Sequence, residues 1–279
     1  AQHAKLFPAP KEALTTDTVK VVCCFGDDFI TPTSVMMASL LNNAKAPVDI
    51  FAMTNASAEN VAFLQSLVAQ FSDRYAHKLH ISPPPSLAHE SIPQGDLFGV
   101  KSNNTYVRLF VPQIFPALKR YIYLDCDLIV RTDIAALWRM DLQGNILGAA
   151  TEPLLYLNGD FGMQNDFEYF NAGVLLVDAE KWRKRDITGK ALGWIGDFIK
   201  NPRRYQYYDQ TPLNRAIGKE RLHLPPAWNM VEWASSNYAQ HYGLSYAAFD
   251  AIKKNPCIYH FAGHKKPWID RWLDATPFA

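Results

Sequence analysis

Residues 121–130 read Tyr121-Ile122-Tyr123-Leu124-Asp125-Cys126-Asp127-Leu128-Ile129-Val130, an apolar run that two acids interrupt two residues apart. Burying two unpaired carboxylates beside such a run would cost on the order of several kcal/mol each, so a positive charge must compensate them. Residues 121–124 are apolar on both faces, as in a central parallel strand. The run therefore predicts a buried strand that ends in a cation site, with a divalent metal ion as the simplest occupant.

The segments before this run alternate between strands and helices. Residues 19–24, 48–53 and 79–81 are short apolar runs typical of buried strands, and helices are predicted after the first two. This alternation predicts an α/β fold, with a doubly wound, mostly parallel sheet in one domain over residues 19–270. Ligands of such sheets bind beyond the carboxyl ends of the strands, where Asp27 is expected beside the two later acids.

The remaining chain extends the same pattern before it becomes irregular. Residues 104–115 are predicted to form a helix that carries Arg108. Beyond Leu222 the chain is aromatic and reads as irregular. Residues 1–18 are expected to be an N-terminal arm and 271–279 a C-terminal tail, and the start at Ala1 suggests a trimmed chain. The other expected elements are strands at 146–151, 169–178 and 257–261 and helices at 133–138, 179–185, 188–200 and 208–217.

The composition narrows the class of protein. Lys plus Arg number 28 and Asp plus Glu 27, so no global field attracts nucleic acid, and any anion site must be local. The cysteines lack a CxxC spacing, which indicates reduced thiols and a cytoplasmic setting, with peripheral contact at the inner face of a membrane as an option. No apolar stretch reaches the ~18 residues of a membrane-spanning helix. The sequence indicates no oligomeric state. The four cysteines are Cys23, Cys24, Cys126 and Cys257.

A second group of functional residue types lies near the end of the chain. His260 ends an apolar run and is expected to join Asp125 and Asp127 as a metal ligand, which favours Mn²⁺, with Mg²⁺ as the second option. Gly263 permits close approach of the backbone, and Lys266 offers a charge for a phosphate. A metal and a lysine on a diphosphate would stabilise it as a leaving group, as in sugar transfer from a nucleotide diphosphate. Turn acids and a packed core histidine are the structural alternatives.

Four motifs in order resemble the family 8 glycosyltransferases, which include bacterial lipopolysaccharide galactosyl- and glucosyltransferases and glycogenin. The resemblance extends from about residue 19 to residue 268, nearly the whole chain. The motifs are Asn104-Thr105-Tyr106-Val107-Arg108-Leu109, then Tyr123-Leu124-Asp125-Cys126-Asp127 continuing through Trp138, then Phe170-Asn171-Ala172-Gly173-Val174, and finally His260-Phe261-Ala262-Gly263 through Lys266-Pro267-Trp268.

This resemblance implies a single GT-A-type domain with a Rossmann-like sheet. It implies retaining transfer of glucose or galactose from a UDP-sugar to a saccharide acceptor, with a lipid-linked glycan such as lipopolysaccharide as the first expectation. By similarity the metal ligands are Asp125, Asp127 and His260. The implied nucleotide contacts are Phe25, Asp27, Asp125, Cys126, Gly263 and Lys266. The implied donor-sugar contacts are Arg108, Glu152, Asn171, Ala172, Gly173, Asp209 and Gln210, and catalytic roles fall to Asp209, Gln210 and Lys266.

The chain departs from the family pattern after its first strand. Relatives commonly carry Asp-Asp-Asn-Tyr there, with the tyrosine stacking on the base, whereas this chain has Asp27-Asp28-Phe29-Ile30. Phe25 or Phe29 is the expected substitute as an apolar platform for the base. A second departure is Thr211, where relatives often have a further aspartate.

Two other readings of the site stay open at this point. An apolar strand ending in Asp-x-Asp also resembles the first motif of haloacid-dehalogenase-type phosphatases, with Asp125 as nucleophile and Asp127 as acid, although two βα units precede it here. A non-catalytic sugar-nucleotide-binding protein would keep the same pocket. If the chain is a transferase, the acceptor attacks either from the face that the leaving group departs or after a double displacement through Asp209 or Glu152. Gln210 is then a positioning group.

Overall fold

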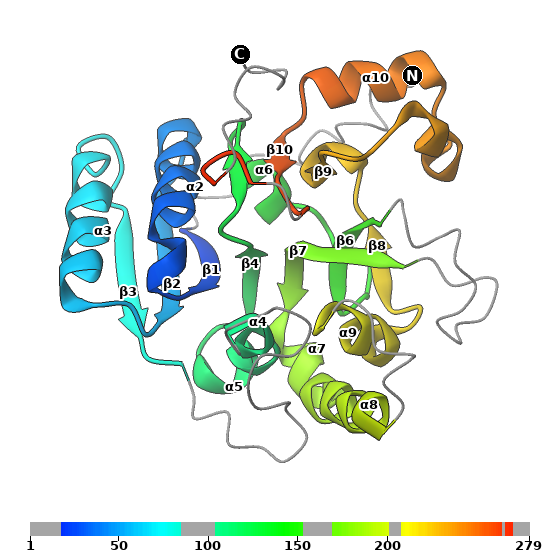
Figure 1. Ribbon diagram of the computed structural model, residues 1–279, viewed down its shortest axis with the longest axis horizontal. Helices are drawn as coiled ribbons and strands as arrows, with labels where there is room; N and C mark the ends of the chain where they lie inside the picture. The colour runs from blue at the N-terminus through cyan, green and yellow to red at the C-terminus, as the bar shows by residue number, and fades with distance from the viewer. Residues whose placement is uncertain (1–17, 85–103, 153–168, 201–207, 264–265, 270–279) are drawn as a thin grey trace.

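The computed structural model describes residues 18–84, 104–152, 169–200, 208–263 and 266–269. The predicted arm up to residue 17 and the predicted tail at 271–279 lie outside these ranges. Within them, seven strands form a central sheet in the order β3-β2-β1-β4-β7-β6-β8 (Figure 1). The strands are β1 (Val19–Phe25), β2 (Val48–Thr54), β3 (Lys78–Ser82), β4 (Arg120–Leu124), β6 (Leu147–Thr151), β7 (Phe170–Asp178) and β8 (Arg221–His223).

The first half of the sheet is parallel, as the alternation of strands and helices predicts. β1 pairs in parallel with β2 and with β4, and β2 pairs in parallel with β3. The crossovers from β1 to β2 and from β2 to β3 contain α2 (Ile30–Asn43) and α3 (Ala58–Gln70). The hydroxyl of Ser57 caps α3 by accepting a hydrogen bond from the Asn60 backbone N–H. The predicted mostly parallel α/β sheet is confirmed.

The direction of the sheet reverses at β7, which the apolar pattern alone does not indicate. β7 runs antiparallel to both β4 and β6, and β6 is parallel to β8. The start of β7 therefore lies beside the carboxyl end of β4, and the Asp125 N–H donates to the Gly173 carbonyl at 2.8 Å. This reversal brings the start of β7 to the edge of the sheet where the two acids of the opening run emerge.

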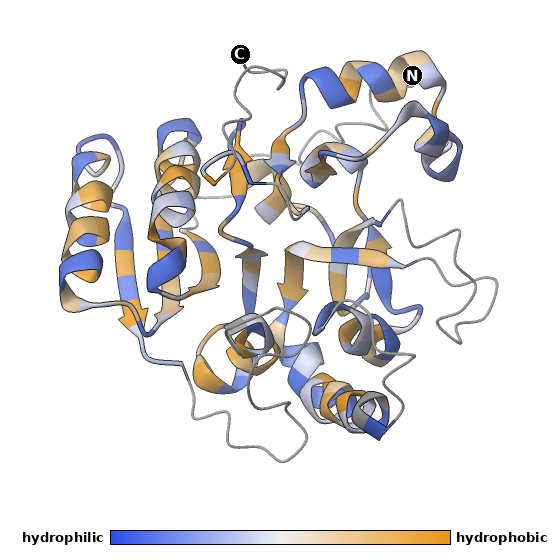
Figure 2. Ribbon diagram, in the orientation of Figure 1, coloured by the Kyte–Doolittle hydropathy of each residue, from blue (hydrophilic) through white to orange (hydrophobic). Residues whose placement is uncertain are grey.

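Helices cover both faces of the sheet, which explains why its strands are continuous apolar runs. Successive residues of β1 enter different cores: Val21 lies in the core that includes the α2 residue Met36, and Val22 lies in the core that includes Trp182. Trp182 belongs to α7 (Ala179–Lys184), which is followed by α8 (Ile187–Lys200). Figure 2 shows that α2, α3 and α8 carry both hydrophobic and hydrophilic residues, as expected for helices that bury one face.

A second, three-stranded sheet brings the late part of the chain to the acids. Its order is β5-β10-β9, from β5 (Leu128–Val130), β10 (Ile258–His260) and β9 (Met230–Val231). β10 is antiparallel to β5, with His260 opposite Leu128, and parallel to β9. Sequence analysis expects a strand near β10 but misses this sheet, because strands of two or three residues have no measurable periodicity.

Two sequence expectations are corrected. Residues 104–115 form not one helix but α4 (Asn104–Val107), a 3-10 turn at 108–110 and α5 (Val111–Ile114). Pro112 has no N–H, and its ring would crowd the carbonyl of residue 108, so the helix is interrupted there. Beyond Leu222 the chain is less irregular than expected, since β9, β10 and α10 (Tyr246–Lys254) lie together at the top of Figure 1. The predicted α6 (Ala135–Trp138) and α9 (Gln210–Ile217) are present.

Among the described residues, no helix combines the length and the apolar character that crossing a membrane requires.

Candidate functional site

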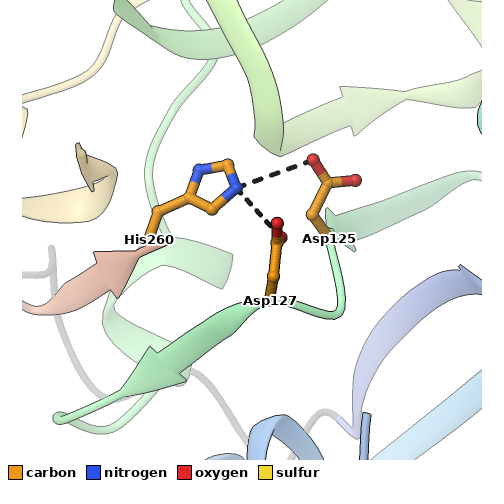
Figure 3. A group of neighbouring side chains, drawn as sticks. All are labelled: Asp125, Asp127 and His260. Carbon is orange, nitrogen blue, oxygen red and sulfur yellow. Dashed lines mark hydrogen bonds and ion pairs between the residues drawn. The ribbon is translucent and has the colours of Figure 1, made fainter. Parts of the chain in front are cut away.

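Asp125, Asp127 and His260 converge at the junction of the two sheets (Figure 3). The two acids lie on either side of Cys126 in the turn between β4 and β5, and His260 ends β10. His260 Nε2 is 3.1 Å from Asp127 Oδ1 and 3.8 Å from Asp125 Oδ2. One ligand atom from each residue can be chosen so that all lie within 4.8 Å of one another. The structure thus brings together the three predicted metal ligands.

The cluster favours positive charge. Burial by itself would raise the pKa of Asp127, but His260 and Lys266 outweigh burial and hold that pKa well below its ordinary range. Burial would lower the pKa of His260, and the attraction of Asp127 overcomes it and raises that pKa. Lys266 Nζ lies 2.6 Å from Asp127 Oδ2 and also donates to the Phe261 carbonyl. Asp127 therefore stays ionised and attracts any cation that enters.

The donor set fits a divalent cation. The Nδ1 atom of His260 lies 2.8 Å from the Asn229 side-chain oxygen, and the Nε2 atom faces the two carboxylates. In a neutral imidazole protonated on Nδ1, the Nε2 lone pair points toward the two carboxylates, so all three groups could share one cation. Two carboxylates and one imidazole are ligands that Mn²⁺ or Mg²⁺ accepts.

Arg108 links the metal cluster to Asp209. Its Nη2 lies 2.9 Å from Asp125 Oδ1, its Nε lies 2.8 Å from Asp209 Oδ2, and its Nη1 donates to the Ala172 carbonyl at 2.9 Å. The guanidinium also lies over the Tyr123 ring. Burial lowers the pKa of Arg108, but Asp125 and Asp209 more than reverse this effect. The guanidinium thus binds two carboxylates and two carbonyls, those of Ala172 and, at 3.2 Å, Thr105.

Asp209 is buried beside this guanidinium. Its Oδ1 accepts from the Thr105 hydroxyl at 2.6 Å, while its Oδ2 pairs with Arg108. Burial raises the pKa of Asp209, and Arg108 offsets this increase only in part. The next residue, Gln210, accepts from the Ala172 N–H at 2.9 Å through its side-chain oxygen. Asp209, which directly precedes α9, is therefore anchored to Arg108 and Thr105, and Gln210, the first residue of α9, is anchored to β7.

Gly173 allows β7 to pass close to the metal cluster. A Cβ atom placed on Gly173 would lie 2.2 Å from His260 Cε1 and 2.9 Å from Asp125 Oδ2, both closer than real Cβ contacts. Any other residue would push the imidazole or the strand away. The glycine of the predicted 170–174 motif is thus required for the close approach of β7 to two metal ligands.

Glu152 follows β6 and is 3% exposed. Its Oε2 accepts from the Asn171 side-chain N–H at 2.8 Å, and its Oε1 accepts from the Trp233 ring N–H at 3.1 Å. Asn171 accepts from the Asn229 side chain at 2.8 Å and from the Gly173 N–H at 2.9 Å. An unbroken polar chain therefore connects Glu152 to His260.

Asn229 and Trp233 belong to the site but are missed by sequence reasoning. The sequence does contain one signal for Asn229: it is the one residue with an amide side chain in the otherwise apolar segment 224–231. A polar side chain in such a segment is either exposed or hydrogen-bonded within the core. Trp233 is one of several aromatic residues nearby, and nothing in the sequence distinguishes it.

The residues predicted to contact the nucleotide lie along the same side of the sheet. Asp27, just after β1, is exposed, and its Oδ1 accepts from the Ser57 N–H and the Asn60 amide at 2.8 and 2.9 Å. The hydrogen bond from Asn60, followed by that from Ser57, lowers the pKa of Asp27. Phe25 is 2% exposed within the core, whereas Phe29 is half-buried and packs edge-on against Trp268. Phe29 thus offers more ring surface than Phe25.

Two other predicted nucleotide contacts are engaged within the protein. Cys126 is buried, and its thiol lies 3.7 Å from the Cys24 carbonyl, to which it donates. The Gly263 N–H donates to Glu232 Oε1 at 2.6 Å. A phosphate that took up this N–H would have to displace the carboxylate of Glu232.

The family model described as Glycosyl transferase family 8 matches residues 20–271. General stress protein A of Bacillus subtilis (strain 168) is 29% identical over 172 residues, which cover 58% of this chain and 58% of that protein. Probable galacturonosyltransferase-like 6 of Arabidopsis thaliana is 24% identical, with 90% and 74% covered. Lipopolysaccharide 1,2-glucosyltransferase of Escherichia coli (strain K12) is 28% identical, with 61% of this chain and 50% of that enzyme covered.

Among solved structures, the galactosyltransferase LgtC, crystallised with donor and acceptor sugar analogues, superposes with a TM-score of 0.71. The two chains are 22% identical, and the match covers 90% of this chain and 89% of LgtC. At this level of identity the likeness establishes the GT-A fold.

Proposed function

This chain belongs to glycosyl transferase family 8, and on that premise we propose that it transfers a neutral hexose from a UDP-sugar to a saccharide acceptor with retention of configuration. One observation carries the proposal: two acids from mid-chain meet a histidine and a lysine from the end of the chain, as a diphosphate site requires. When bound, a divalent ion, Mn²⁺ or Mg²⁺, held by Asp125, Asp127 and His260 supplies positive charge for the departing diphosphate.

In this proposal Lys266 stabilises the leaving group directly. Its ammonium lies between Asp127 and the Phe261 carbonyl, and a phosphate oxygen would replace one of these partners. Such charge-assisted hydrogen bonds are roughly twice as strong as neutral ones. Lys266 thus holds the diphosphate and favours cleavage of its bond to the sugar.

The contacts made by the carboxylates of Asp209 and Glu152 favour direct attack by the acceptor, on the same face of the sugar from which the leaving group departs. A double displacement needs a nucleophilic carboxylate with an available oxygen. Asp209 Oδ1 accepts from the Thr105 hydroxyl, and its Oδ2 is held in an ion pair with Arg108 although it accepts no aligned hydrogen bond from the described residues. Both oxygens of Glu152 accept hydrogen bonds, from Asn171 and Trp233. The acceptor proton then goes to the leaving phosphate oxygen, and Gln210 positions the sugar.

A neutral hexose suits the charges around the proposed sugar position. Asp125, Glu152 and Asp209 are acidic, and the nearby guanidinium of Arg108 is already paired with two of them. A hexuronic acid, the class that the name of the plant relative indicates, would add a further carboxylate beside Asp125, Glu152 and Asp209. Like charges at close range are unfavourable in a partly buried site.

The decisive experiment is a donor screen. The protein is incubated with Mn²⁺ and UDP-glucose, UDP-galactose, their N-acetyl forms or the two UDP-hexuronic acids, and released UDP is measured. We expect release with UDP-glucose or UDP-galactose. Release from the hexuronic acids alone would overturn the choice of donor, and no release from any donor, with or without a saccharide acceptor, would overturn the proposed activity.

For the acceptor we propose a lipid-linked glycan of the cell surface, such as lipopolysaccharide, at the inner face of a membrane. The similarity to the Escherichia coli lipopolysaccharide glucosyltransferase supports this choice. Transfer of radiolabelled hexose to extracted glycolipid, compared with transfer to soluble oligosaccharides, tests it. Label only in the soluble fraction would rule out the lipid-linked acceptor.

The family match does not favour a phosphatase. The glycosyl transferase family 8 model covers residues 20–271, including Asp125, which would be the nucleophile of a phosphatase. Phosphate release from p-nitrophenyl phosphate is the measurement that would reopen this alternative.

A further inference from the structure

The direction of every hydrogen bond in the polar chain from Glu152 to His260 can be assigned by chemistry. The Gly173 backbone N–H can only donate, so it fixes the oxygen of the Asn171 amide, which accepts it at 2.9 Å. The other end of that amide, the Asn171 nitrogen, then donates to Glu152 Oε2 at 2.8 Å. The two ends of the Asn171 side chain are therefore distinguished by groups that cannot exchange roles.

Asn229 inherits its orientation from Asn171. Since the Asn171 oxygen faces it, Asn229 must present its nitrogen there, and that contact is 2.8 Å long. The Asn229 oxygen then faces His260 Nδ1, also at 2.8 Å. An amide oxygen only accepts, so Nδ1 must carry the proton. The side chains of Glu152, Asn171, Asn229 and His260 are all buried, so their hydrogen bonds to one another are shielded from bulk solvent.

We propose that Asn229 is a positioning residue that holds His260 in the Nδ1-protonated form, so that the Nε2 lone pair is presented to the cation held with Asp125 and Asp127. The functional role inferred for Asn229 rests on the proposed metal-dependent activity. The hydrogen bonds from Glu152 to His260 are present in the structure without a metal. Partners on the distal nitrogen of a histidine ligand orient the ring and raise its basicity, and losing one typically costs 10–100-fold in metal affinity. Glu152 and Asn171 orient the Asn229 side chain and so act on His260 only through it.

Two substitutions separate positioning from simple core stability. Asn229→Ala removes the acceptor for Nδ1–H and the donor to Asn171. Asn229→Asp keeps an acceptor for Nδ1–H and loses only the donor. If Asn229 has only a structural role, Asn229→Asp should lower metal affinity more than Asn229→Ala does. The reason is that the aspartate adds a buried charge beside the Asn171 oxygen and so disturbs the core more. The positioning role predicts the opposite order for metal affinity.

The first readout is Mn²⁺ binding to the purified protein without donor, measured by titration calorimetry. We expect the dissociation constant to rise about 10–100-fold in Asn229→Ala and to stay close to that of the unchanged protein in Asn229→Asp. Asn43→Ala is the matched control, since the Asn43 amide also tethers the small sheet, through the Val130 carbonyl at 3.0 Å, but does not contact the cluster. Its affinity should not change.

The second readout is the protonation of the ring itself. Nitrogen NMR of histidine-labelled, metal-free protein at alkaline pH distinguishes the two neutral forms, and His260→Gln identifies the signal. We expect Nδ1–H in the unchanged protein and in Asn229→Asp. In Asn229→Ala this preference should be lost, because Asp127 Oδ1, 3.1 Å from Nε2, is then the remaining acceptor described beside the ring and favours Nε2–H. An Nε2–H ring in the unchanged protein, or wild-type Mn²⁺ affinity in a folded Asn229→Ala, would overturn the proposal. Nδ1–H together with no Mn²⁺ binding would instead refute the metal-dependent function alone.

Discussion

Replacing Arg108 with methionine tests whether its guanidinium holds the two sides of the site together. The substitution keeps an unbranched side chain of similar length but leaves Asp125 and Asp209 without their partner. The two ion pairs are 2.9 and 2.8 Å long, and the Arg108 side chain is 10% exposed. Removing one partner of a buried pair costs about 3–5 kcal/mol, a large part of the ~5–15 kcal/mol that stabilises a typical domain.

Urea denaturation followed by circular dichroism measures this cost. With a urea dependence of about 2–3 kcal/mol per M, the midpoint should fall by about 1–2.5 M. A second substitution, Asp209→Asn, removes one of the stranded charges, so the double variant should be more stable than Arg108→Met alone. This non-additivity is the signature of the pair.

The pH dependence of the Arg108→Met variant provides an independent check. The folded-state pKa of Asp209 already exceeds its ordinary value through burial, and loss of Arg108 raises it further. The folded state then binds protons that the unfolded state does not, so the variant should become more stable as the pH falls from 7 toward about 5. A loss below about 1 kcal/mol, or strict additivity with Asp209→Asn, would refute the reasoning.

Asp127→Asn should lower UDP release in the presence of Mn²⁺ by about 10²-fold or more, whereas exposed Asp28→Asn should not; equal rates would contradict the metal assignment. Gly173→Ala should weaken Mn²⁺ binding in calorimetry, because its Cβ would collide with the imidazole, while Gly193→Ala, in open space on α8, should not. Burial lowers the pKa of His77, whose Nδ1 accepts from the first β2 amide, so its contribution to stability fades as the pH falls below about 6.5. His77→Asn keeps the acceptor and should flatten the melting temperature between pH 7 and 5; an unchanged slope would refute this.

The sequence was sufficient to predict the parts of the site that have a strong local pattern. Asp125 and Asp127 interrupt an apolar strand, and His260 ends another, so their chemistry and their place at strand ends follow from burial cost alone. The parallel half of the sheet follows from the alternation of strands and helices.

The parts that could not be predicted depend on contacts between distant segments. β7 is as apolar as β4, and apolar pattern contains no information on strand direction, so the reversal that places Gly173 against His260 is invisible. The role of Asn229 depends on the orientation of Asn171, a residue 58 positions away. No short window of the sequence contains both ends of such a contact.

The antiparallel pairing of β10 with β5 has a consequence for how the protein is made. His260 lies 133 residues after Asp127, and a ribosome adds about 5–20 residues per second, so about 7–27 s separate the synthesis of the two side chains. During that interval the nascent sheet carries its acids without the imidazole and lysine that later neutralise them. A chain that ends just before β10 would therefore contain the strands of the central sheet but lack His260 and Lys266, the partners of Asp127 in the proposed site.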